Sequence, residues 1–154
     1  MTELDLLDGL VCEVKEALEG YRLRSAKENL IPINVYAQNM PLKEGKDDEK
    51  LYPYVCVCFD RESVEDFDTP MLAEIYFLIG VMDKNTDRQG YRDVLQIANL
   101  IYQHIFRKRF VAKAFSVLRP YRIQLEQEAP YPYFVGGMEM FFEMPVFETE
   151  EDLI

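Results

Sequence analysis

The chain has 154 residues, enough to bury the core of one domain, and 49% of them are apolar, which excludes a disordered chain. Its 28 acidic residues against 17 lysines and arginines give a formal charge of −11, so its field repels phosphate backbones and disfavours nucleic-acid binding. No apolar stretch approaches the length of a membrane-spanning helix, and the N-terminus lacks the basic and apolar segments of a secretory signal. We therefore expect a protein that stays where it is made, without specific nucleic-acid binding and without membrane contact.

The first part of the chain predicts a helix followed by a strand. Leucines and valines recur at helical spacing from residue 3 to about residue 20, and acidic residues occupy the first turns, where the helix dipole favours them. Gly20 marks the end of this helix. Apolar and polar side chains then alternate over residues 31–39, which predicts a half-buried strand.

Two further strands are predicted in the middle of the chain. A charged loop over residues 43–50 precedes a strand over 54–59, and the polar segment 60–68 is expected to be a second loop. Residues 71–82 form the strongest strand pattern, with largely apolar side chains on both faces. We expect this strand to lie at the centre of a sheet.

The second half predicts a helix and two more strands. The helix is expected to begin at residue 86 or 87, with Thr86 and Gln89 as a capping box, and to end at Arg107. Strands are predicted over 115–126 and 134–144. The expected order is α-β-β-β-α-β-β, and it predicts one α+β domain over 1–154: a mixed, mostly antiparallel sheet with helices packed on it, and an acidic tail at 148–154.

The residues that carry metal or thiol chemistry are few. The three cysteines, Cys12, Cys56 and Cys58, lack the spacing of a disulfide framework, which indicates reduced thiols of the cytosol that serve as small apolar side chains. The single histidine, His104, is interpreted as a packing or helix-surface residue, because no serine or thiol motif accompanies it.

Two groups of acidic residues fall short of a cation site. The Asp83-x-Asn85-x-Asp87 run begins like a calcium loop, but Arg88 and Val94 stand where that loop needs glycine and glutamate, so we interpret it as a strand-to-helix turn. A second group has no histidine and nothing to fix its geometry, and is interpreted as a solvated loop: Asp60, Glu62, Glu65, Asp66 and Asp68.

Glycine pairs and basic clusters also lack a binding motif. Gly136-Gly137 belongs to no phosphate-binding pattern and is interpreted as a bulge at the entry to the last strand. The cations Arg107, Lys108, Arg109 and Lys113 are interpreted as complements of the helix dipole. We expect a protein that is not an enzyme and that has no catalytic residues, no cofactor site and no metal site.

The succession of elements resembles a known family. Tyr52-Pro53-Tyr54-Val55 opens a strand, the apolar strand that follows ends in Asp83, and Gly90-Tyr91-Arg92-Asp93-Val94-Leu95 lies on a helix. Pro130-Tyr131-Pro132-Tyr133 then precedes a strand that ends in Phe142-Glu143-Met144-Pro145. Over residues 31–148 this order is similar to that of the tail terminator, or tail completion, proteins of tailed bacteriophages and prophages.

The resemblance implies a small α+β subunit without catalytic residues that assembles into a homo-oligomeric ring, typically a hexamer. Such a ring caps the tail tube protein, stops its polymerisation and offers a surface to the head or neck connector protein. It implies the cytoplasm of a bacterial host during assembly and the virion tail afterwards. Two alternatives remain: a neck, head-completion or tail-like particle subunit, and a small-molecule binding module with a pocket lined by tyrosine and methionine.

Overall fold

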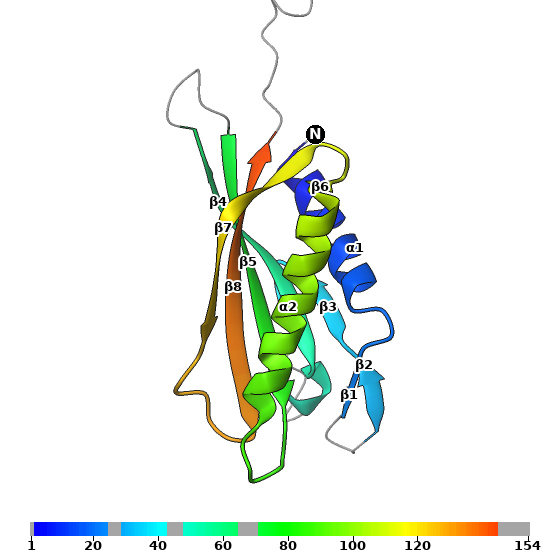
Figure 1. Ribbon diagram of the computed structural model, residues 1–154. Helices are drawn as coiled ribbons and strands as arrows, with labels where there is room; N and C mark the ends of the chain where they lie inside the picture. The colour runs from blue at the N-terminus through cyan, green and yellow to red at the C-terminus, as the bar shows by residue number, and fades with distance from the viewer. Residues whose placement is uncertain (1, 25–28, 43–47, 65–70, 145–154) are drawn as a thin grey trace, which may run out of the picture.

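One six-stranded sheet carries two helices on one of its faces in the computed structural model of the chain (Figure 1). The structure describes residues 2–24, 29–42, 48–64 and 71–144. The elements are α1 (Glu3–Ala17), β1 (Arg22–Arg24), β2 (Leu30–Pro32), β3 (Asn34–Ala37), the 3-10 turn η1 (Asp48–Leu51), β4 (Tyr54–Ser63), β5 (Met71–Met82), α2 (Gly90–Lys108), β6 (Phe110–Val111), β7 (Phe115–Leu125) and β8 (Tyr133–Met144).

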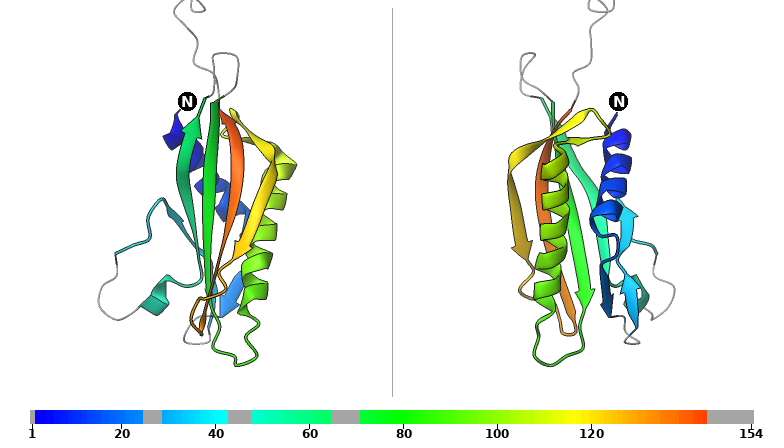
Figure 2. Two further views of the ribbon diagram at one scale, coloured as in Figure 1. Left: turned by 90° about the vertical axis from the view of Figure 1, so that its left-hand side faces the viewer. Right: turned by 45° about the vertical axis from the view of Figure 1, so that its right-hand side comes forward.

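The strand order of the sheet is β3-β4-β5-β8-β7-β6, and β1 pairs with β2 in a separate two-stranded sheet. Only the β3–β4 pair among the described strands is parallel, and the others are antiparallel. The predicted α+β class, a mixed and mostly antiparallel sheet with helices packed on it, is therefore confirmed. Figure 2 shows this arrangement from two sides, with α1 and α2 together behind one face of the sheet.

The central position predicted for residues 71–82 is also confirmed, because β5 pairs with β8 over its whole length and with β4 over residues 72–80. Alternate side chains of β5 point towards the helices, and Ala73, Ile75 and Phe77 are fully buried there. The apolar stripe of α2 packs against them, with Val94, Ile97, Ala98, Ile101 and Ile105 buried. The apolar residues that alternate along the strand and those that recur every 3.6 residues along the helix thus pack together in one core.

The strand expected over residues 31–39 is divided by Ile33 into β2 and β3, which belong to different sheets. Its β2 half pairs with β1, a three-residue strand that the sequence pattern did not predict. The strand expected over 54–59 continues to Ser63, so residues 60–63 are not a loop. Residues 61–63 pair with β5 beyond an irregularity between Phe59 and Arg61, because backbone hydrogen bonds extend a strand even where its side chains are polar.

The two helices are shorter than predicted. At the start of α1 the backbone N–H of Thr2 donates to Asp5 Oδ2 at 2.7 Å, and the helix ends at Ala17, before Gly20 turns the chain with φ +81°. The α2 helix begins at Gly90 and not at 86 or 87, and its first residue is preceded by Gln89 without a side-chain cap. The capping box was therefore a wrong prediction.

The glycine pair of β8 forms no bulge against β5, because the β5–β8 register runs unbroken through Gly136 and Gly137. A Cβ atom on Gly136 would lie 2.7 Å from Val94 of α2. One on Gly137 would meet the ring of Tyr76, which lies on the opposite face of the sheet. The two glycines therefore admit a helix side chain on one face and a tyrosine ring on the other.

Candidate functional site

The thiols of β4 lie on the sheet face that the helices leave uncovered. Cys56 is buried, Cys58 is partly buried, and their Sγ atoms are 3.6 Å apart. Burial raises the pKa of Cys56 to about 12 and also raises the pKa of Cys58, so both remain thiols at neutral pH and are poor nucleophiles. The sequence predicted that all three cysteines serve as small apolar side chains of the interior, but Cys12 is exposed on α1.

His104 joins the two helices. Its Nε2 atom lies 2.7 Å from Glu13 Oε2 and 3.3 Å from Glu16 Oε2, both on α1. These three side chains are close enough to ligate one ion. Lys108 Nζ, however, lies 3.2 Å from Glu13 Oε1 and 2.8 Å from Glu16 Oε2 and supplies the positive charge itself. The cluster therefore serves as an interhelical ion-pair network, and His104 is a contact residue of the helix surface.

Hydrogen bonding and charge attraction between Lys108 and Glu16 shift the pKa values of both groups in the directions expected for an ion pair. The hydrogen bond from Lys108, followed by its charge, lowers the pKa of Glu16. The hydrogen bonds to Glu16 and Glu13 raise the pKa of Lys108. Lys108 thus contacts the neighbouring helix, beyond the role in the helix dipole that the sequence predicted for the Arg107–Arg109 cluster and Lys113.

The described acidic residues singled out in the sequence lie in the β5–α2 turn and on β4. Asp83 Oδ1 accepts the N–H of Asn85 at 3.0 Å, which confirms a turn between β5 and α2. Asp60 and Glu62 lie on β4, while Glu65, Asp66, Asp68 and the acidic tail at 148–154 lie outside the described residues. Glu62 instead approaches Glu3 of α1, and burial followed by the hydrogen bond to Glu3 raises the pKa of Glu62.

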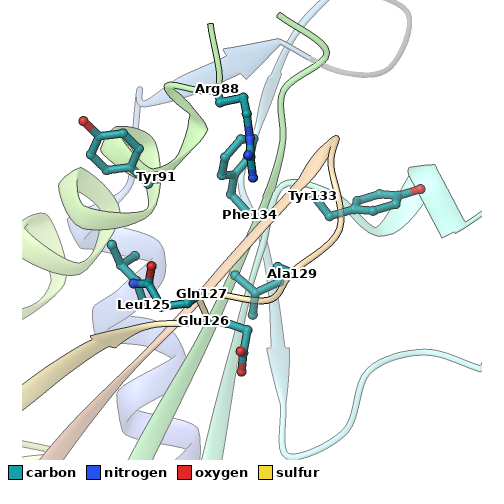
Figure 3. A pocket seen from close by; sticks show the side chains of 9 residues that line it. Arg88, Tyr91, Leu125, Glu126, Gln127, Ala129, Tyr133 and Phe134 are labelled. Atoms are coloured by element: carbon teal, nitrogen blue, oxygen red, sulfur yellow. The ribbon is translucent and has the colours of Figure 1, made fainter. Parts of the chain in front are cut away.

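A pocket of about 410 Å³ lies where the β5–α2 and β7–β8 connections meet (Figure 3). Arg88 reaches over it with φ 56°, a left-handed conformation that is costly for a residue with a side chain. Phe134 lies beside Arg88 and packs against Gly90, where a Cβ atom would lie 2.3 Å from its ring. The remaining lining residues mix apolar and polar groups: Tyr91, Leu125, Glu126, Gln127, Ala129, Tyr133 and Val135.

A second hollow, of about 630 Å³, lies between α2 and the part of β7 that contains Arg119 and Tyr121. Tyr102 of α2 stacks on Tyr121 of β7 with ring centroids 4.4 Å apart, and Phe106 lies 5.8 Å from Tyr121. The Arg119 guanidinium sits 5.8 Å above the Phe106 ring, within the range of a cation–π contact. Gln103 and Arg107 complete what we call the α2–β7 groove.

This groove was not recognised in the sequence, although part of its signal was present. Tyr102 and Phe106 follow Ile101 and Ile105 by one position each, so they form a second apolar stripe at the edge of the buried one. The contribution of Tyr121 depends on a register shift of β7 between Leu118 and Arg122, which no local pattern predicts.

The sheet face opposite the helices, which we call the open face, is covered by none of the described helices (Figure 2). Tyr76 and Leu78 of β5 lie here, and Leu118 of β7 pairs with Phe141 of β8 beside them. Each of these four side chains is only half-buried, since its cover comes from neighbouring strands. Charged residues alternate with them, and Arg61 forms an ion pair with Glu74.

Comparison with known proteins adds no assignment: no protein-family model matches the chain, and no curated protein matches it either. Within the described residues, neither helix combines the length and the apolar character that crossing a bilayer requires.

Proposed function

We propose that this chain is a structural subunit of a tailed phage or prophage, a tail terminator that closes as a ring on the end of the tail tube. In this proposal the ring is a homo-oligomer, a hexamer, that contacts the tail tube protein on one side and the head or neck connector on the other. It assembles in the host cytoplasm and remains in the virion tail. Its role is structural and not catalytic.

The observation that carries the proposal is the open face of the sheet. If this face stayed in contact with water, the half-buried side chains of Tyr76, Leu78 and Phe141 would add little to the stability of the domain. Aromatic and aliphatic side chains interleaved with charges are instead typical of surfaces that contact other proteins. The reactive groups of the described residues support a structural role as well. The β4 thiols are protonated, and His104 is engaged by two glutamates and lies in no nucleophile–base arrangement that these residues form.

Deletion of the gene from the phage or prophage that encodes it tests this function. A terminator stops tube growth, so its loss is expected to give tails of abnormal length that do not join heads. Complementation with the wild-type gene should restore both length and joining. Tails of normal length that stay unjoined would instead assign the chain to the neck or head-completion class, and normal, joined tails would refute a tail role.

A small-molecule binding module is the second candidate, because the pocket beneath Arg88 combines a guanidinium, the exposed Tyr91 and the apolar Phe134. Such convergent polar groups in an apolar hollow are the general character of ligand sites. Native mass spectrometry of the purified protein tests it. A bound small molecule in the wild type that is absent from Arg88→Gln would support this function, and unliganded protein in both would refute it.

A further inference from the structure

We propose that the α2–β7 groove of one copy receives the outer face of α1 of a second copy, so that subunits join head to tail. The inference rests on the proposed function in one respect: it identifies the surfaces through which the subunits of the proposed ring would contact one another. It concerns the two flanks of the helix layer, which carry complementary features and lie on opposite sides of α2 (Figure 1).

The groove flank is aromatic and positive. Tyr121 remains 38% exposed although it stacks on Tyr102, so the stack is open to a partner on one side. Arg107 and Arg119 form no ion pair with a described residue, and both line the groove. Arg107 and Arg119 place positive charge beside the exposed Tyr121 ring, and this combination favours an acidic partner with apolar contacts.

The α1 flank has the matching character. Its outward stripe, at spacings of three and four residues, consists of Leu4, Asp8, Cys12 and Lys15, all exposed, and the exposed Glu19 follows in the turn just after the helix. Leu4 is 69% exposed, which is high for a leucine on a helix that also supplies the core. Asp8 and Glu19 form no ion pair with a described residue. The stripe therefore offers an apolar contact flanked by unpaired carboxylates.

The geometry also fits a helix. The α2 helix packs beside α1 on one flank, whereas on its other flank no helix of the described residues covers Tyr121 of β7 in the groove. Neighbouring helices pack with axes about 8–10 Å apart. A second α1 in the groove would continue the helix layer over β7, and because groove and α1 are different surfaces, the contact is heterologous and leads to a ring when the rotation closes.

Chemical cross-linking of purified protein at high concentration tests this contact. Cys12 lies on the α1 stripe and Gln103 is exposed at the groove, so Gln103→Cys places one thiol on each proposed surface. A short bismaleimide linker is expected to give a ladder of dimers, trimers and larger species, because each chain then links to two neighbours. The matched control, Cys12→Ser with Gln103→Cys, should give no species beyond a dimer.

Charge reversal then identifies the partner surface. Arg107→Glu with Arg119→Glu, added to the Gln103→Cys chain, is expected to reduce the ladder at least about fivefold. Adding Asp8→Arg and Glu19→Arg to that same chain should restore it, since the exchanged charges are complementary again. Arg22→Glu with Arg92→Glu changes the net charge equally, away from the groove, and should leave the ladder intact.

Absence of a ladder, or a ladder that survives groove reversal, would overturn the inference. The inference would also be overturned if charge reversal in the groove left the ladder unchanged and instead abolished binding of a different protein. The deletion experiment fails separately: a charge-dependent ladder with normal, joined tails would keep this contact and refute the terminator role. Abnormal tails without a ladder would do the opposite.

Discussion

The two faces of the central sheet are built from the same strands but differ in what covers them. Phe77 and Phe142 on the helix-covered face are fully buried, whereas Phe141, next to Phe142 in sequence, is half-buried on the open face. Alternation along a strand thus assigns one residue to the core and the next to a surface. The difference teaches that the fully buried phenylalanines lie on the helix-covered face, while the open face, although Cys56 is buried there, keeps Phe141 partly accessible to solvent.

The largest contrast is expected between two phenylalanines. Phe77→Ala removes a fully buried ring and leaves a cavity, so it should lower the free energy of unfolding by about 3–5 kcal/mol. Phe141→Ala removes a half-buried ring and should cost roughly 1 kcal/mol. Urea unfolding with unchanged m-values measures both losses. Equal losses would contradict the contrast and indicate that the open face is already covered in the free protein.

The adjacent glycines of β8 give the next contrast. Gly136→Ala places a Cβ atom 2.7 Å from Val94 and 3.1 Å from the backbone oxygen of Gln124, so overpacking should cost about 1–3 kcal/mol. Gly137→Ala meets only the Tyr76 ring, which can swing into solvent on the open face, and should cost less than about 1 kcal/mol. Thermal unfolding of the pair measures this difference. A larger loss for Gly137→Ala would show that the Tyr76 ring is held in place.

Two glutamates extend the comparison to charge. The pKa of Glu62 is raised in the fold, so ionisation opposes folding at neutral pH, and this penalty disappears as pH falls through the raised pKa. Glu62→Gln should therefore stabilise the protein at pH 7, by well under about 1 kcal/mol because solvent screens the group, with a gain that shrinks on acidification. Glu74→Gln, its control on the open face, loses the exposed ion pair with Arg61 and should destabilise the protein only slightly. Urea unfolding at pH 7 and at acid pH measures both, and a loss of stability in Glu62→Gln would refute this account.

The smallest effect is expected from the interhelical network. Because folding lowers the pKa of Glu16, this residue stabilises the folded state at pH values above its pKa in the unfolded chain. The contribution is lost as the pH falls through the pKa of Glu16 in the folded protein. Lys108→Met should remove it, so the variant should be slightly less stable at pH 7 and equal to wild type in strong acid. Lys15→Met, which changes an exposed lysine of α1 outside the network, is the control. Chemical denaturation from pH 7 to pH 2 measures the difference, and a constant offset would contradict this origin.

Local patterns in the sequence were sufficient for the elements that bury an apolar face. The residues of β5 alternate and those of α2 recur every three or four positions, so the bounds of β5 were predicted and its central position followed from two apolar faces. The Asp83 turn was predictable for a similar reason, because its hydrogen bond spans only two residues. The second stripe of Tyr102 and Phe106 was visible, but not what it faces.

The tertiary structure alone decided the features that depend on contacts between distant residues. The pairing of β1 with β2 and that of β6 with β7 each depend on at least one strand of two or three residues, which is too short for a periodic pattern. Glu13 and His104 are 91 residues apart, and Gly136 and Gly137 are explained only by the side chains above and below them. The sequence by itself determined the periodicity and hence the layers. Which strand edge stays free, and which rings meet across the α2–β7 groove, follows from register and packing, because these are properties of the assembled chain and not of any segment.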